Sequence, residues 1–90
     1  MIELHCIISG RVQMVMFRDF TQRKARSLGI TGWVRNLPDG TVEVVAQGER
    51  PVLEELLRKL HRGPLLAKVA GIRTEWRPVS EPLVGFELIR

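Results

Sequence analysis

The stretch from Gly10 to Arg18, GRVQMVMFR, contains the residue types of this sequence that best suit anion binding. It follows a segment that alternates like a strand and precedes one with helical spacing. Such a loop presents free backbone N–H groups at the positive end of a helix, a general phosphate-binding arrangement. Arg18 adds a planar guanidinium whose N–H groups match phosphate oxygens. On residue types alone, a connecting loop with a surface arginine explains the stretch equally well.

The other residues with chemical potential are few and scattered. His5 and His61 belong to different expected elements, and no carboxylates cluster at ligand spacing, so we predict neither a metal site nor a cofactor. Cys6 is the only cysteine and lies in an apolar-rich segment, where we interpret it as a core residue and not as a catalytic thiol. A lone cysteine allows no internal disulfide and favours a reducing, cytoplasmic setting.

Periodicity predicts the elements that position the loop. The first is a strand from Ile2 to Ser9 that Gly10 ends, and the second is a helix from about Arg18 to Leu28 with Gly29 just past its end. A hairpin follows, with strands Ile30–Asn36 and Thr41–Ala46 around a Leu37-Pro38-Asp39-Gly40 turn. The remaining elements are a second helix from Pro51 to the Gly63-Pro64 pair and strands Val69–Trp76 and Phe86–Ile89. Glu54–Arg58 and Glu55–Lys59 are predicted i,i+4 ion pairs on the second helix.

Apolar spacing also predicts the buried side chains. They are Ile2, Leu4, Cys6 and Ile8 on the first strand, Phe17, Phe20, Ala25 and Leu28 on the first helix, Val42, Val44 and Ala46 on the third strand, and Val52, Leu53, Leu56, Leu57 and Leu60 on the second helix.

This order, β-α-β-β-α-β plus a short terminal strand, is the α+β split-βαβ arrangement called ferredoxin-like. We therefore predict one domain over residues 1–90, with an antiparallel sheet and two helices on one of its faces. In this fold the first and third strands are central, and the second runs parallel to the first on the far side of the third. The Gly10–Arg18 loop and Asn36 then emerge at the same end of the sheet.

Two motifs resemble the signatures of the acylphosphatase family. GRVQMVMFR is similar to the first signature, G-R-V-Q-G-V-x-F-R, and GWVRNLPDGTVE, from Gly32 to Glu43, matches the second. The order and lengths of the elements agree too, so the resemblance covers essentially the whole chain. It implies hydrolysis of small acyl phosphates without metal.

The resemblance also implies which residues act. Arg18 and Asn36 would be catalytic, the first holding the phosphate, or a sulfate-like anion, and the second positioning the attacking water. The phosphate-binding loop would consist of Gln13, Met14, Val15, Met16, Phe17 and Arg18.

Met14 stands where the family signature has glycine. If this position needs a positive φ, methionine costs about 1–2 kcal/mol locally, and its side chain could crowd the phosphate. If the position accepts a negative φ, Met14 only covers the rim of the pocket. The sequence leaves both open.

Two other function classes compete with the enzyme. The net charge of +4 is compatible with an RNA-binding split-βαβ domain. Such domains stack bases on aromatic residues of the central strands, whereas Thr41–Ala46 has none, so we do not expect nucleic acid as a partner. The second alternative is a relative of the enzyme without catalytic activity, which stays open because Met14 replaces the signature glycine. We expect a monomer with neither a membrane span nor a signal peptide.

Overall fold

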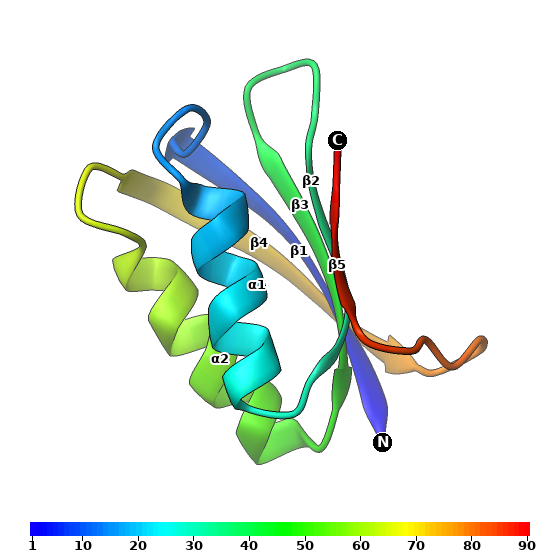
Figure 1. Cartoon of the computed structure of the whole chain (residues 1–90). Coiled ribbons are helices and arrows are strands. Elements are labelled where there is room, and N and C mark those ends of the chain that lie inside the picture. The colour runs from blue at the N-terminus through cyan, green and yellow to red at the C-terminus, as the bar shows by residue number, and fades with distance from the viewer.

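The computed structural model describes all 90 residues as seven elements (Figure 1). Their bounds are β1 Ile2–Arg11, α1 Phe17–Ser27, β2 Thr31–Asn36, β3 Val42–Gly48, α2 Arg50–Arg62, β4 Lys68–Pro78 and β5 Phe86–Ile89. All predicted elements are present in the predicted order. None of the helices has the length and apolarity that a bilayer crossing requires.

The five strands form one sheet in the order β4-β1-β3-β2-β5. β1 and β3 are central, and β1–β3, β1–β4 and β2–β3 pair antiparallel, which confirms the predicted ferredoxin-like fold. β5 joins the edge of β2 in parallel, so the sheet as a whole is mixed. Because β1 and β2 both lie antiparallel to β3, the ends of β1 and β2 point the same way, as the topology predicted.

Both helices cover one face of this sheet (Figure 1), and the core lies between the two layers. The alternating residues Leu4, Cys6 and Ile8 of β1 are fully buried there. Five predicted core residues are only partly buried, namely Ile2, Phe20, Leu28, Val52 and Leu57. Thr21 takes a buried position on α1, where its hydroxyl donates a 2.8 Å hydrogen bond to the Phe17 carbonyl, so its polar group is satisfied.

The surface of α2 carries a different pairing from the one predicted. Lys59 does pair with Glu55, at 3.5 Å, but the predicted Glu54–Arg58 pair is wrong. Glu54 pairs with Arg50, one turn earlier, at 3.4 Å, and Arg58 turns to Glu55. Long exposed side chains have several partners within reach, and helical spacing alone does not choose among them.

Gly10 does not end the first strand, contrary to the prediction. β1 runs on to Arg11 by pairing with Lys68 of β4, and its register shifts between Ser9 and Gly10. Gly10 has φ 117°, and a Cβ there would lie 2.2 Å from the Lys68 carbonyl oxygen. Glycine is therefore needed for a β-bulge, which bends the strand as it approaches the loop. The loop between β1 and α1 is therefore shorter than the predicted Gly10–Arg18 loop and spans residues 12–16.

Candidate active site

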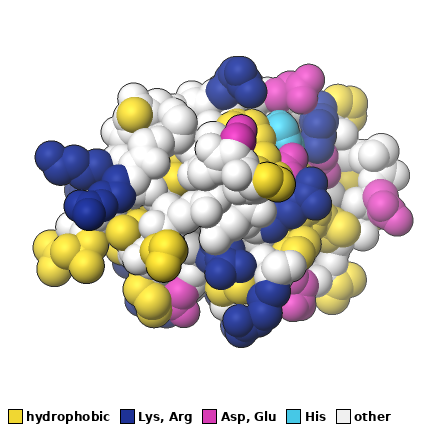
Figure 2. All heavy atoms as spheres, turned by 90° about the horizontal axis from the view of Figure 1, so that it is seen from above, with side chains coloured by type: hydrophobic (Ala, Val, Ile, Leu, Met, Phe, Trp, Pro, Cys, Tyr) yellow, Lys and Arg dark blue, Asp and Glu magenta, His cyan; other side chains and the backbone are white.

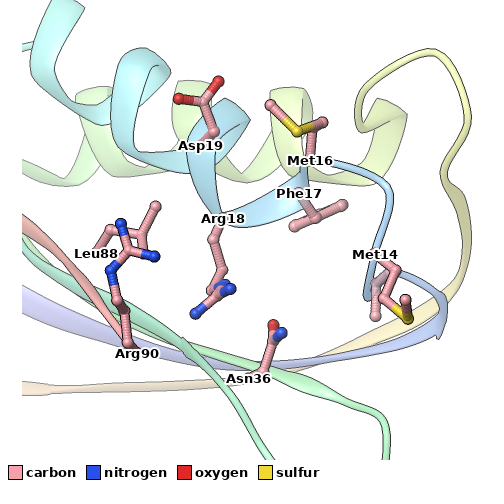
Figure 3. A pocket seen from close by; sticks show the side chains of 9 residues that line it. Met14, Met16, Phe17, Arg18, Asp19, Asn36, Leu88 and Arg90 are labelled. Atoms are coloured by element: carbon pink, nitrogen blue, oxygen red, sulfur yellow. The ribbon is translucent and has the colours of Figure 1, made fainter.

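A pocket of about 540 Å³ opens where this loop meets the start of α1 (Figure 3). It is lined by Val12, Met14, Met16, Phe17, Arg18, Asp19, Asn36, Leu88 and Arg90. These residues come from the 12–16 loop, from the first turn of α1, from the last residue of β2, and from β5 and the residue that follows it. Segments far apart in sequence therefore meet at one end of the sheet.

The loop is fixed at both of its ends. Val12 and Phe17 are each 1% exposed and belong to the hydrophobic core, so they fix where the loop begins and ends. Between them, the Gln13 side chain donates hydrogen bonds to the carbonyls of Leu37 and Thr41, at 2.8 and 2.9 Å. These bonds tie the loop to the β2–β3 turn and place it beside the end of β2.

The middle of the loop is strained. Met14 has φ 62° and Met16 has φ 66°, and they are the only residues other than glycine with a positive φ. Each such residue costs on the order of 1–2 kcal/mol. The sequence left two conformations open for Met14, and the structure has the one that disfavours a side chain. The fixed ends explain how the fold sustains this strain.

The strained loop leads directly into α1. Met16 is the N-cap residue, its side chain makes no capping bond, and its carbonyl accepts a 3.0 Å bond from the Phe20 N–H. The N–H groups of residues 17–19 precede this first helical bond and are available to a ligand. Asp19 pairs with Arg23, at 2.9 Å, which leaves its charge neutralised beside the pocket. The start of α1 is thus suited to bind an anion.

Arg18 is held by the C-terminal strand. One of its guanidinium nitrogens donates a 2.9 Å hydrogen bond to the Ile89 carbonyl. β5 is itself fixed by its pairing with β2 and by a 3.0 Å bond from the Gln22 amide to the Phe86 carbonyl. Neither Arg18 nor Arg90, the second arginine of the pocket, forms an ion pair. The pocket therefore holds two cations whose charges no acidic side chain neutralises.

Asn36 faces Arg18 from the end of β2, and Figure 3 shows its amide reaching up from the sheet toward the guanidinium. Its Oδ1 is buried and has no hydrogen-bond partner. A buried acceptor without a partner is costly, and its position in the pocket makes Oδ1 a candidate acceptor for a bound molecule. The neighbouring Arg35 points elsewhere and pairs with Glu43 at 2.7 Å.

The pocket contains most of the predicted site residues but not all of them. Met14, Met16, Phe17, Arg18 and Asn36 line it. Gln13 and Val15 do not: the Gln13 amide bonds to the turn, and Val15 packs against the core. Val12, Asp19, Leu88 and Arg90 also line the pocket and were not predicted. Val12 and Asp19 flank the loop in sequence, whereas no sequence signal brings Leu88 and Arg90 there.

The pocket offers charge and positioning and has no proton-transfer group at its centre. No three His, Cys, Asp or Glu residues come together as a metal-binding group. Burial raises the pKa of the Cys6 thiol to about 12, and Cys6 lies in the core outside the pocket, so it is not a thiolate nucleophile. An arginine, backbone N–H groups and an amide are suited to holding an anion while water reacts with it.

Comparison with known proteins identifies similar chains. The family model described as Acylphosphatase matches residues 4–88. A protein of Rubrobacter xylanophilus named Acylphosphatase is 52% identical over 81 residues, which are 90% of this chain and 74% of that protein. The crystal structure of acylphosphatase from Bacillus subtilis has a TM-score of 0.97 at 32% identity and covers all of both chains. An acylphosphatase structure from Coxiella burnetii has a TM-score of 0.90 at 40% identity, covering 97% of this chain and 90% of that one.

Proposed function

The chain belongs to the acylphosphatase family and has the family's activity, the hydrolysis of acyl phosphates, and we propose that Arg18 and Asn36 carry out this reaction. In this proposal Arg18 and the N–H groups of the loop and first helical turn hold the phosphate. Asn36 holds the attacking water through its Oδ1. Met14, Met16 and Phe17 line the pocket around the bound substrate.

The reaction needs neither a general acid nor a strong general base from the protein. A bond forms between the water oxygen and phosphorus, and the bond between phosphorus and the acyl oxygen breaks. The electron pair leaves on a carboxylate whose conjugate acid has a pKa near ~4, so no general acid is needed. Because phosphoryl transfer passes through a loose transition state, the water need not lose its proton early, and a phosphate oxygen can take it afterwards. The products are a carboxylate and inorganic phosphate.

The observation that carries this proposal is that Arg18 and Asn36 line one pocket, with Oδ1 of Asn36 unpartnered. One side chain supplies positive charge and the other supplies a directed acceptor. The Ile89 carbonyl restricts the movement of Arg18, and the pairing of β2 with β3 holds the backbone of Asn36. This preorganisation is what a site needs when positioning and electrostatics are its main contributions. An acceptor without a partner inside a pocket that also holds an arginine favours the enzyme over a catalytically silent domain.

The test is hydrolysis of acetyl phosphate in the presence of a chelator. We expect turnover by the wild type and a fall of about 100-fold or more in kcat/KM for Arg18→Gln, the usual cost of removing one charge-stabilising donor. Arg23→Gln is the matched control, because Arg23 lies on the same helix and its charge pairs with Asp19 outside the pocket lining. No turnover by the wild type, or equal activity of the two variants, would contradict the proposal.

The setting in which the enzyme works is part of the same proposal. We infer one domain over residues 1–90 that acts as a monomer in the cytoplasm and has no nucleic acid partner. Support comes from a pocket built within one chain, from the buried thiol of Cys6 and from ion pairs on the open face of the sheet. Light scattering on the purified chain measures the oligomeric state, and a dimer would contradict this part alone.

A further inference from the structure

We propose that Met14 and Met16 form a binding subsite for the acyl group, so that the preferred substrates are acyl phosphates with hydrocarbon chains of several carbons. The inference rests on the proposed function, since it assigns the phosphate to Arg18. It concerns the part of the substrate that the phosphate site leaves unrecognised.

Strain without packing is the first observation. Met14 is 100% exposed and Met16 is 69% exposed, although both adopt the disfavoured positive φ. Neither side chain lies in the hydrophobic core, so neither gains burial that would offset the strain. Residues with strained backbone conformations cluster at ligand-binding and active sites. Their apolar character limits the ligand to one that offers hydrocarbon.

The second observation is the size and lining of the pocket. A phosphate group displaces about as much volume as four or five waters, roughly 150 Å³ at ~30 Å³ each. The pocket measures about 540 Å³, so room remains beside the phosphate. Met14 and Met16 supply apolar surface to that room, and Leu88 lies beside Arg90 on the other flank (Figure 3). Methionine is unbranched and flexible, which suits it to cover alkyl chains of different lengths.

The third observation is the direction in which the acyl group leaves phosphorus. The attacking and leaving oxygens lie roughly in line across phosphorus. Figure 3 shows Asn36 rising from the sheet toward the start of α1, with Arg18 and Phe17 above it and Met16 beyond them. A water bound at Asn36 therefore sends the acyl group away from the sheet, toward the start of α1 and the loop that carries Met14 and Met16. Figure 2, which looks onto this end of the molecule, shows hydrophobic side chains exposed next to basic ones.

Arg90 supplies the rival interpretation. It lies on the other flank of the pocket without an acidic partner, and a distal carboxylate on the acyl group would suit it. The backbone strain falls on the two methionines and not on this flank, which is why we assign the chain to the apolar side. The two interpretations predict different substrates, so one experiment separates them.

The experiment compares kcat/KM for acetyl, butyryl, hexanoyl and succinyl phosphate. A half-buried methylene gives about a twofold gain, so we expect hexanoyl phosphate to be favoured over acetyl phosphate by about tenfold. In the double variant Met14→Gln, Met16→Gln this preference should fall to about threefold or less. Glutamine keeps the unbranched shape and the same backbone demand. Val84→Gln, at a site 91% exposed and outside the pocket lining, is the matched control and should keep the tenfold preference.

The other outcomes overturn the proposal. Equal kcat/KM values for acetyl and hexanoyl phosphate in the wild type would overturn it, as would a tenfold preference that survives in the double variant. A preference for succinyl over butyryl phosphate would favour the Arg90 interpretation instead. A wild-type dimer that the double variant abolishes would mean that the methionines form a protein interface. If the wild type hydrolyses none of the substrates, the proposed function fails instead. Inhibition by hexylphosphonate relative to methylphosphonate measures the same preference without turnover, and it applies to either single methionine variant if the double variant does not fold.

Discussion

The open face of the sheet and the pocket are both rich in charge, but they use it in opposite ways. On the open face Glu43 is paired with both His5 and Arg35, at 2.7 Å each, and Glu3 accepts hydrogen bonds from Gln47 and Arg77. In the pocket, Arg18 and Arg90 have no acidic partner. Charges that are paired within the protein hold strands together, whereas charges left unpaired in a concave site await a ligand.

The same contrast applies to polar atoms along β2. Thr31 and Asn36, at the two ends of this strand, each bury a side-chain oxygen that has no hydrogen-bond partner. They stand five residues apart, about 17 Å at the rise of a strand. Only Asn36 lines the pocket. Replacing each residue in turn tests whether position in the pocket, and not burial alone, makes an unpartnered oxygen functional.

Among the variants that test this contrast along β2, Asn36→Ala has the largest expected effect. We expect kcat for acetyl phosphate to fall by about 100-fold, because the attacking water loses its positioning acceptor. The affinity for inorganic phosphate, measured as a competitive inhibition constant, should change much less, because Arg18 still holds the anion. A positioning role thus predicts a split between kcat and phosphate affinity.

Thr31→Val is the matched control for this prediction. It removes the other unpartnered oxygen of β2 with little change in volume and should leave kcat unchanged. Its free energy of unfolding should not fall, since no hydrogen bond is lost. A loss of kcat in Thr31→Val as large as that in Asn36→Ala would mean that β2 acts through its stability, and the contrast between the two ends would be wrong.

Much of this contrast could be predicted from the sequence. The apolar period of 2 in Ile2–Ile8 and the helical stripe of α2 predicted the two layers. The split-βαβ topology predicted that Asn36 lies at the same end of the sheet as the Arg18 loop, and both residues line the pocket. Local pattern and topology decide these features together, since a sheet needs one buried face.

The features that could not be predicted depend on contacts between distant segments. The bulge at Gly10 exists because β4 passes close to it, and a glycine read in isolation looks like a strand end. The pairing of β5 with the edge of β2 brings the Ile89 carbonyl to Arg18 and Arg90 to the pocket. No residue spacing within β5 encodes this neighbour. The φ of Met14 likewise follows from the fixed ends of its loop and not from its residue type.

The open face should make stability dependent on pH. Burial raises the pKa of Glu43, but hydrogen bonds from His5 and Arg35 outweigh it, and the pKa lies below its ordinary value of 4.5. A carboxyl whose pKa is lowered by folding stabilises the protein above its unfolded pKa, and this contribution is lost as the pH falls through the folded pKa. Urea unfolding should therefore show Glu43→Gln to be less stable by about 1–3 kcal/mol at pH 7, with the difference shrinking below pH ~4.5.

The control for this measurement is Glu87→Gln on β5, an exposed carboxylate without an ion-pair partner. Its stability should follow that of the wild type at every pH. If Glu43→Gln follows the wild type as well, the paired charges contribute nothing measurable. In that case pairing would not distinguish the open face from the pocket.

Met14→Gly has the smallest expected effect on stability, and it tests whether the positive φ of Met14 strains the pocket loop. Glycine relieves about 1–2 kcal/mol at φ 62°. It also gives the unfolded chain more freedom, which costs about 0.5–1 kcal/mol. The net change should lie between about zero and a gain of about 1.5 kcal/mol in the free energy of unfolding. With acetyl phosphate, which is too short to reach far beyond the phosphate site, kcat/KM should change little or rise. A stability loss larger than 1 kcal/mol would mean that the Met14 side chain supports the fold, and its strain would then no longer point to a ligand.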